Sequence, residues 1–131
     1  MILTQVLPHL YSIQLGVVRA FLIDTDELTL VDTGMPGSAE KITNAVRELG
    51  RNPSEIRHIL VTHCHPDHAG SLAMLKSLTG ALAYMHSDGY IMEIIPDLIE
   101  LGLDILNPQF NCHNLKELAN LVRGKIGRAH V

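Results

Sequence analysis

The sequence carries a cluster of potential metal-binding side chains within six residues, His63–His68. Three imidazoles and one carboxylate, from His63, His65, Asp67 and His68, follow directly after a short apolar run. Ligands this close along one strand-to-loop turn must also lie close together in space. Imidazole nitrogen and carboxylate oxygen are donors that zinc, iron and manganese bind in proteins. The motif therefore predicts a metal site rather than a solvated loop that happens to be rich in histidine.

The spacing within the motif suggests how the ligands are divided. His63 and His65 are two residues apart, so on an extended backbone they face the same side and can bind one ion. Asp67 and His68 lie beyond the turn at Pro66 and can hold a second ion or a bridging water. Two ions close together would lower the pKa of a shared water and polarise a carbonyl or phosphoryl oxygen. Asp67 is then the candidate catalytic residue, because it can both bind metal and steer the proton of the attacking hydroxide.

A second carboxylate, that of Asp32, ends a neighbouring apolar strand. A histidine that binds metal commonly donates its other ring N–H to a carboxylate, which orients the ring. An aspartate at this position can also serve simply as a turn or helix-cap residue. Because the histidine cluster is present, we favour a hydrogen bond from one of its imidazoles to Asp32.

The composition is typical of a single small soluble domain. The 131 residues are 47% hydrophobic and 18% charged, with a net charge of −4, which indicates neither disorder nor a nucleic-acid surface. The N-terminus lacks a signal-peptide pattern, and no apolar run is long enough to span a bilayer. Cys64 and Cys112 form no C-x-x-C pair, so no disulfide framework is expected. These features predict a cytoplasmic protein without membrane contact.

The N-terminal third of the chain is rich in predicted β-strands, the first of the elements that must position the motif. Val6–Leu15 and Val17–Asp24 are β-prone runs that meet at Gly16, and Leu28–Asp32 is a short apolar strand. Together they predict an antiparallel meander, with Pro8 confining its first strand to a sheet edge.

A βαβ unit follows and places the motif. Ser38 is predicted to cap a helix that ends at Gly50, and the apolar stripe of this helix is Ile42, Ala45, Val46 and Leu49. A strand is predicted over His58–Thr62. Strand, helix and strand of these lengths form a right-handed crossover in a parallel sheet. The His63–His68 loop then lies at the carboxyl end of a strand, where open α/β sheets carry their sites.

The remaining elements are predicted less regularly. A helix over residues 72–78 closes at Gly80, and it is expected to bury its apolar residues, Met74, Leu75 and Leu78. A strand over 81–85 and a helix from Ser87 to about Ile95, ended by Pro96, come next. Residues 97–109 have no clear pattern, and Asn114 is predicted to cap a last helix.

The segments Val31-Asp32-Thr33-Gly34 and Thr62-His63-Cys64-His65-Pro66-Asp67-His68-Ala69-Gly70, separated by one βαβ crossover, together resemble the metallo-β-lactamase superfamily. The resemblance extends over Leu7–His86. It implies an α/β (α+β) fold, half of an αββα sandwich, whose mixed sheet joins the antiparallel meander to βαβ units. It also implies two zinc ions, with iron or manganese as alternatives. His63 and His65 would bind the first ion, and Asp67 and His68 the second.

The resemblance implies a metal-dependent hydrolase with a small-molecule substrate. Metal-bound hydroxide would attack an ester, thioester or lactone carbonyl, as in glyoxalase II-like thioesterases and lactonases. The superfamily also includes β-lactamases, sulfatases, nucleases and iron-dependent persulfide dioxygenases, and the fold does not choose among them. An iron-dependent dioxygenase and a non-catalytic metal-binding module remain the alternatives.

The sequence also departs from the family pattern. That pattern continues with a third histidine, a bridging aspartate and a final histidine, in contexts that this chain lacks. His86 is read as structural or solvated, and His113 and His130 lack the expected neighbours. We therefore expect residues 1–124 to be the N-terminal part of one domain, inactive alone and with an exposed apolar sheet face. Two copies could cover that face by dimerising, although no residue pattern favours this.

The last residues have an unusual coding possibility. Residues 126–131 can be encoded by a stretch that matches a common sequencing-library adapter, and Lys125 can supply the two preceding bases. The tail 125–131 is therefore predicted to be non-native. Any other codons at these positions would exclude this origin.

Overall fold

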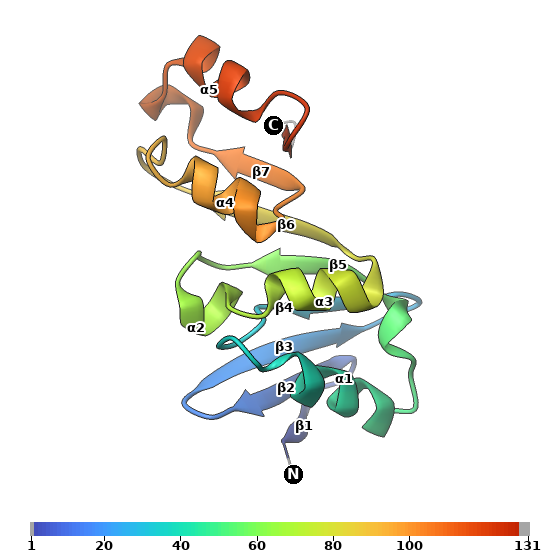
Figure 1. The fold of residues 1–131 in the computed structure, drawn as a ribbon. Helices are drawn as coiled ribbons and strands as arrows, with labels where there is room; N and C mark the ends of the chain where they lie inside the picture. Colours follow the sequence, from blue (N-terminus) through green and yellow to red (C-terminus); the bar gives the residue numbers. More distant parts are fainter. Residues whose placement is uncertain (1, 129–131) are drawn as a thin grey trace.

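Eight strands form one mixed sheet in the computed structural model, which describes residues 2–128 (Figure 1). The strands are β1 Leu3–Leu7, β2 Leu10–Leu15, β3 Val18–Asp24, β4 Leu28–Val31, β5 Ile56–Val61, β6 Leu82–Ser87, β7 Ile105–Pro108 and β8 Gly127–Arg128. They lie side by side in sequence order. β1 to β4 pair antiparallel and β4 to β8 pair parallel, which confirms the predicted meander followed by parallel strands.

The helices are α1 Ala39–Glu48, α2 Pro66–Ala69, α3 Leu72–Thr79, α4 Ile95–Leu101 and α5 Leu115–Val122, with 3₁₀ turns η1 Pro53–Glu55 and η2 Phe110–Cys112. Each parallel strand is added beside the previous one. Crossovers between parallel strands are almost always right-handed, and crossovers of one hand between strands in this order carry successive helices to the same side of the sheet. Figure 1 shows α1, α3 and α4 on one side of the strands.

Burial along the strands distinguishes the two faces of the sheet. On the helix-covered face, one row of residues in register has no exposed surface: Leu22, Leu30, Ile59 and Ala83. The adjacent row points to the other face, which we call the open face: Phe21, Val31, Leu60, Tyr84 and Ile105. The side chains of this second row are apolar or aromatic and only partly buried. The open face therefore carries an apolar row, next to which lie the polar side chains of Thr29 and His58.

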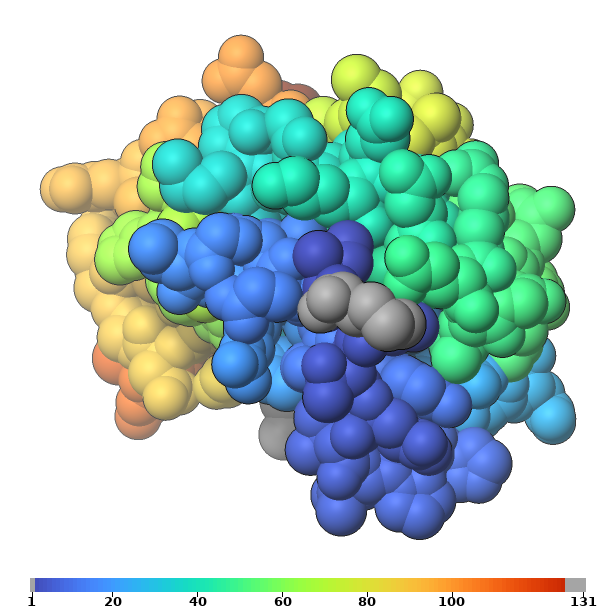
Figure 2. All heavy atoms as spheres, turned by 90° about the horizontal axis from the view of Figure 1, so that it is seen from below, coloured from blue at the N-terminus to red at the C-terminus, as the bar shows by residue number. Residues whose placement is uncertain are grey.

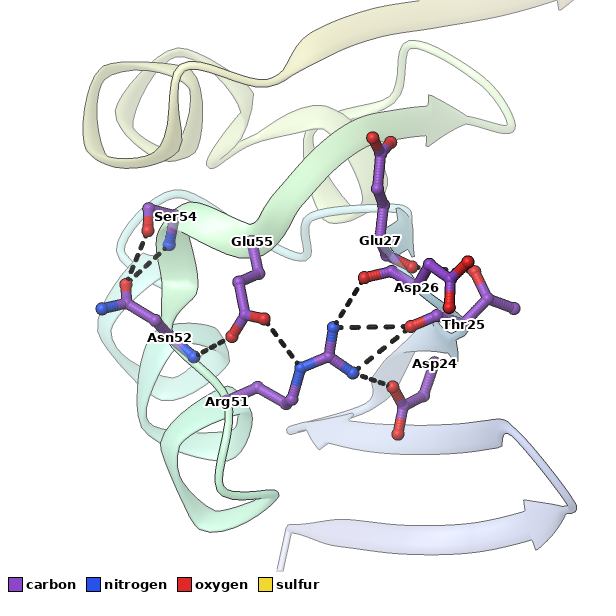
Figure 3. Close-up of polar contacts among 8 residues, drawn as sticks. All are labelled: Asp24, Thr25, Asp26, Glu27, Arg51, Asn52, Ser54 and Glu55. Carbon is purple, nitrogen blue, oxygen red and sulfur yellow. Dashed lines mark hydrogen bonds and ion pairs between the residues drawn. The ribbon is translucent and has the colours of Figure 1, made fainter.

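Arg51 ties the connection between α1 and β5 to the turn between β3 and β4 (Figure 3). Its guanidinium donates to the Asp24 carboxylate and to the backbone carbonyls of Thr25 and Asp26. Its Nε also donates to the Glu55 carboxylate at 3.0 Å. This turn precedes β4, so Arg51 stabilises the end of the sheet opposite to the metal motif.

Asn52 begins η1 with a capping box that the sequence analysis did not identify. The Asn52 side chain accepts the Ser54 N–H at 2.9 Å, and the Glu55 carboxylate accepts the Asn52 N–H at 2.6 Å. The Asn52 backbone N–H and then Arg51 hold the pKa of Glu55 below its usual value of 4.5. These bonds fix the backbone where it enters β5.

Two predictions in the N-terminal third were wrong. The run Val6–Leu15 is not one strand, because the chain reverses at Pro8–His9, where His9 has a φ of 67°. β1, which ends before Pro8, is the edge strand on this side of the sheet, and β8 is the edge strand on the other. Figure 2 shows the first strands (blue) projecting from the body of the molecule. Ser38 precedes α1, but its side chain makes no capping bond. Its backbone N–H instead donates to Ser71 Oγ at 2.9 Å, because the starts of α1 and α3 pack together.

The helix predicted from Ser87 to Ile95 was also wrong. β6 extends to Ser87, and α4 begins at Ile95 with Pro96 in its first turn. Proline suits this position, because its φ is already helical and its missing N–H would have no helical partner. Pro96 therefore starts a helix instead of ending one. Asn114 does cap α5, since its side chain accepts two backbone N–H groups of the first turn.

The expectation that α3 buries all three of its apolar residues was wrong for two of them. Leu75 is buried, but Met74 and Leu78 are 58% and 54% exposed. The buried stripe of α3 is formed by Leu72, Leu75 and Thr79, so Met74 and Leu78 lie on a different side of the helix.

The predicted tail extends beyond the described residues. Gly127–Arg128 pairs with β7, whereas residues 129–131, including His130, lie outside the described part of the chain. The origin of residues 125–131 therefore stays a prediction. No helix within residues 2–128 is long and apolar enough to cross a membrane.

Candidate metal centre

Parallel pairing brings Asp32 to the histidine motif. β4 and β5 are parallel neighbours, so the residues that follow Val31 and Val61 leave the sheet at the same end, the carboxyl ends of these strands. The Asp32 N–H continues the ladder by donating to the Leu60 carbonyl at 2.8 Å. Thirty positions apart in sequence, Asp32 and Thr62 are thereby in direct contact.

Three of the four predicted ligands gather around one point. His63, Asp67 and His68 each offer a ligand atom, and these atoms lie within 4.8 Å of one another. The His63 and His68 rings are 4.0 Å apart between centroids. Pro66 begins the short helix α2, and this turn folds Asp67 and His68 back towards His63.

His65 lies outside this cluster. It precedes α2 as an exposed residue with an extended backbone, and its carbonyl accepts the N–H groups of His68 and Ala69. Its ring is edge-on to that of His63, with the centroids 4.9 Å apart. The geometry thus groups His63 with Asp67 and His68, whereas the sequence prediction paired His63 with His65.

Asp32 is the buried acceptor at the centre of the loop. Only 6% of its surface is exposed. Its Oδ1 accepts the Thr62 N–H at 2.8 Å, and its Oδ2 faces His68 Nδ1 at 2.8 Å. Its φ is 66°, a left-handed conformation that aspartate tolerates better than most residues. The carboxylate can only accept, so His68 carries its proton on Nδ1 and presents Nε2 to the cluster.

Thr62 links the Asp32 carboxylate to the His63 ring. The sequence analysis did not identify Thr62 as a site residue. Its Oγ1 lies 2.9 and 2.8 Å from the two Asp32 oxygens and 3.0 Å from His63 Nδ1. The hydroxyl has one proton, which it donates to the carboxylate, so it must accept from the Nδ1–H of His63. Each imidazole therefore uses Nδ1 in a hydrogen bond, which leaves Nε2 as the nitrogen available to a metal ion. The only sequence signal was the position of a hydroxyl residue directly before the motif.

The loop after β4 also forms hydrogen bonds with the backbone of the motif. The Thr33 N–H and hydroxyl both donate to the His68 carbonyl, at 2.7 and 2.9 Å. The Gly70 N–H donates to the Gly34 carbonyl at 2.9 Å. A Cβ on Gly70 would lie 2.3 Å from the Pro66 carbonyl oxygen, so only glycine fits here. These contacts fix α2 and its candidate ligands against the end of β4.

The donor set suits a divalent transition metal. Two neutral imidazole nitrogens and one carboxylate are a common ligand set for a catalytic zinc with an open position. Each imidazole is already oriented by a hydrogen bond at its other nitrogen, as is usual for histidine ligands. The residues present therefore fit a metal ion.

A family model described as the metallo-beta-lactamase superfamily matches residues 13–103, a span that contains Asp32, Thr62 and the whole His63–His68 motif. The chain belongs to this superfamily. The match covers more than half of the sequence, and it agrees with the resemblance seen in the motif and with the mixed sheet.

Individual proteins of the superfamily align with shorter stretches of this chain or at lower sequence identity. A hydroxyacylglutathione hydrolase of Albidiferax ferrireducens is 43% identical over 49 residues, 37% of this chain and 18% of the relative. An N-acyl homoserine lactonase of Bacillus sp is 29% identical over 112 residues, 62% of this chain and 45% of the relative. The crystal structure of BJP-1, a subclass B3 metallo-beta-lactamase of Bradyrhizobium japonicum, superposes with a TM-score of 0.60 at 33% identity, covering 64% of this chain and 32% of the lactamase. The chain thus spans less than half the length of each.

The other described histidines that the sequence analysis considered lie outside the cluster. His86 is exposed, and hydrogen bonds to Asn107 and then Asp88 raise its pKa above 6.5. His113 Nε2 accepts the Ile91 N–H at 3.0 Å, so that imidazole is engaged in holding a loop.

Proposed function

We propose that this chain carries the metal-binding part of a hydrolase that cleaves an ester, thioester or lactone. The observation that carries the proposal is the convergence of His63, Asp67 and His68 with both imidazoles held in the Nε2-presenting form. Zinc is the proposed ion, because it accepts this donor set and needs no redox chemistry for hydrolysis.

The ion would lower the pKa of a water and polarise the substrate carbonyl. Asp67 Oδ2 lies 3.4 Å from His68 Nε2, so the Asp67 carboxylate is at the ligand atoms and can receive the proton of the attacking water at that oxygen. Asp32 holds the Nδ1 proton of His68, and Thr62 holds that of His63. The imidazoles are thereby kept from rotating when charge develops at the carbonyl oxygen.

The carbonyl substrate class is supported by the names of the relatives. One is described as a hydroxyacylglutathione hydrolase and another as an N-acyl homoserine lactonase. Hydrolysis of a thioester and of a lactone both require water to attack an acyl carbonyl. A carbonyl substrate is therefore favoured over a phosphoryl one for this chain.

His65 and further groups from a longer protein are proposed to complete the site. His65 lies beside His63 but outside the three-residue cluster, where it could serve an additional ion. We expect the 131 residues alone to bind metal but to hydrolyse slowly, because three ligands on one edge leave much of a substrate pocket unbuilt.

Metal binding tests the first step of the proposal. Metal-free chain is titrated with zinc against a chromophoric chelator, and His63→Ala or His68→Ala is expected to weaken binding more than about tenfold. His58→Ala is the matched control, since His58 is an exposed histidine on β5 outside the cluster. Equal zinc affinity in all variants would refute the assignment of the ligands.

Hydrolysis tests the second step. The zinc-loaded chain, and the same chain continued to the length of its relatives, are assayed on a hydroxyacyl thioester and an N-acyl homoserine lactone. We expect zinc-dependent acid release by the longer protein, abolished by Asp67→Asn. Oxygen consumption with iron and a persulfide, without hydrolysis, would instead assign the protein to the dioxygenases.

A further inference from the structure

A groove of about 780 Å³ runs along the helix-covered side of the molecule, away from the open face. α1 contributes one wall through Ala39, Glu40, Thr43 and Arg47. α3 contributes the other through Ala73, Met74 and Leu78, and Asn52–Ser54 of the η1 turn line it as well. Its volume lies within the range of small-molecule sites.

The α3 wall of the groove is apolar and exposed. Met74 and Leu78 are separated by one helical turn, and both are more than half exposed. They are the residues that the sequence analysis expected to be buried. Exposed methionine and leucine side chains that line a concavity can cover an apolar molecule.

The charges of the α1 wall are separated along its length. Glu40 lies in the first turn of α1 and Arg47 in the last, which is about 10 Å along a helix at 1.5 Å per residue. Within residues 2–128, neither side chain has an ion-pair partner, and Arg47 donates only to Asn44 at 3.0 Å. The wall therefore has an acidic end and a basic end.

Polar donors lie at the basic end of the groove. The side-chain amide oxygen of Asn52, Oδ1, accepts both the N–H and the hydroxyl of Ser54, each at 2.9 Å. The amide nitrogen of Asn52 points away from those bonds in Figure 3. Arg47 and this amide are donors without an acidic partner in the described structure, and donors of this kind recognise a carboxylate.

We propose that the groove binds a medium-chain carboxylate. The carboxylate lies at Arg47 and Asn52, and the alkyl chain lies along Leu78 and Met74 towards the start of α1. Glu40 sets the orientation, because it repels a carboxylate at the opposite end. The site is on the helix side of the sheet and does not depend on the proposed hydrolase function.

Decanoate titrated into the 131-residue protein tests the proposal, with backbone amide shifts in NMR as the readout. A carboxylate of this size is expected to bind with a Kd on the order of 1 mM. The perturbed amides should lie in α1, α3 and η1, with zinc present or after chelation. Decanol, which has the same chain without the charge, should bind roughly fivefold more weakly.

Variants on both walls distinguish specific binding of the carboxylate from non-specific apolar binding. Arg47→Gln should weaken decanoate binding roughly fivefold without altering decanol binding, and Leu78→Asp should abolish both. Lys41→Gln is the matched control, since it removes a charge from α1 outside the groove. Unchanged affinity in Arg47→Gln would overturn the proposal. So would shifts confined to the open face, or self-association of the chain through Met74 and Leu78.

Discussion

Replacing Asp32 by asparagine should disturb the orientation of His68 and lower the stability of the fold. The substitution keeps the size and the left-handed φ of 66°, because asparagine also tolerates that conformation. It changes one acceptor oxygen into an NH2 donor. If the remaining oxygen keeps the Thr62 N–H, the new NH2 group faces His68 Nδ1. His68 must then move its proton to Nε2 or turn away, and either change removes its ligand atom from the cluster.

The size of the effect follows from the lost contact. A hydrogen bond to a charged group contributes about 1.5–3 kcal/mol, so the metal-free protein should lose about that much stability. Disrupting the partner of a histidine ligand typically costs about 10–100-fold in metal affinity, or about 1.4–2.7 kcal/mol. Asp32→Ala should lower the free energy of unfolding by a further amount of about 1–2 kcal/mol, because alanine is strained at a positive φ.

Two measurements check this reasoning. Urea unfolding in the presence of a chelator gives the metal-free stability, and competition with a chromophoric chelator gives the zinc affinity. Asp26→Asn is the control, since Asp26 is exposed at the far end of β4. If Asp32→Asn unfolds at the wild-type urea concentration and binds zinc within about twofold of wild type, Asp32 does not orient His68.

Three further outcomes are expected. Arg51→Lys should lower the free energy of unfolding by about 1–2 kcal/mol in urea titrations, because a lysine cannot reach the same set of acceptors; an unchanged midpoint would contradict this. Gly70→Ala should cost about 1–3 kcal/mol in the same assay, since its Cβ overlaps the backbone of α2, and wild-type stability would show that the loop yields freely. The pKa of His86, followed by NMR, should lie above 6.5 and fall in Asp88→Asn. Because this pKa is raised by folding, the contribution of His86 to stability is complete below pH 6.5 and is lost as the pH rises through the folded value.

Local sequence patterns correctly predicted the helices and strands whose conformation depends on their own residues. The β-prone run of β3, the short apolar run of β4 and the apolar stripe of α1 were sufficient, because burying a continuous apolar row requires one conformation. Predictions failed where a distant partner decided the outcome. Ser38 does not cap α1 with its side chain, because Ser71 of another segment bonds its backbone. Ser87 does not begin a helix, because it continues β6 by pairing with Pro108 of β7, and the next helix begins only at Ile95.

The sequence by itself determined the donor chemistry of the candidate metal centre. His63, His65, Asp67 and His68 are within six positions, so any fold keeps these donors near one another. Only the tertiary structure decided which of them converge and in which protonated form. Parallel pairing of β4 with β5 places Asp32 beneath Thr62 and His68, and one carboxylate then determines the proton positions of two imidazoles. The physical reason is that a hydrogen bond of about 2.8 Å depends on strand register between residues 30 or more positions apart, which no local pattern contains.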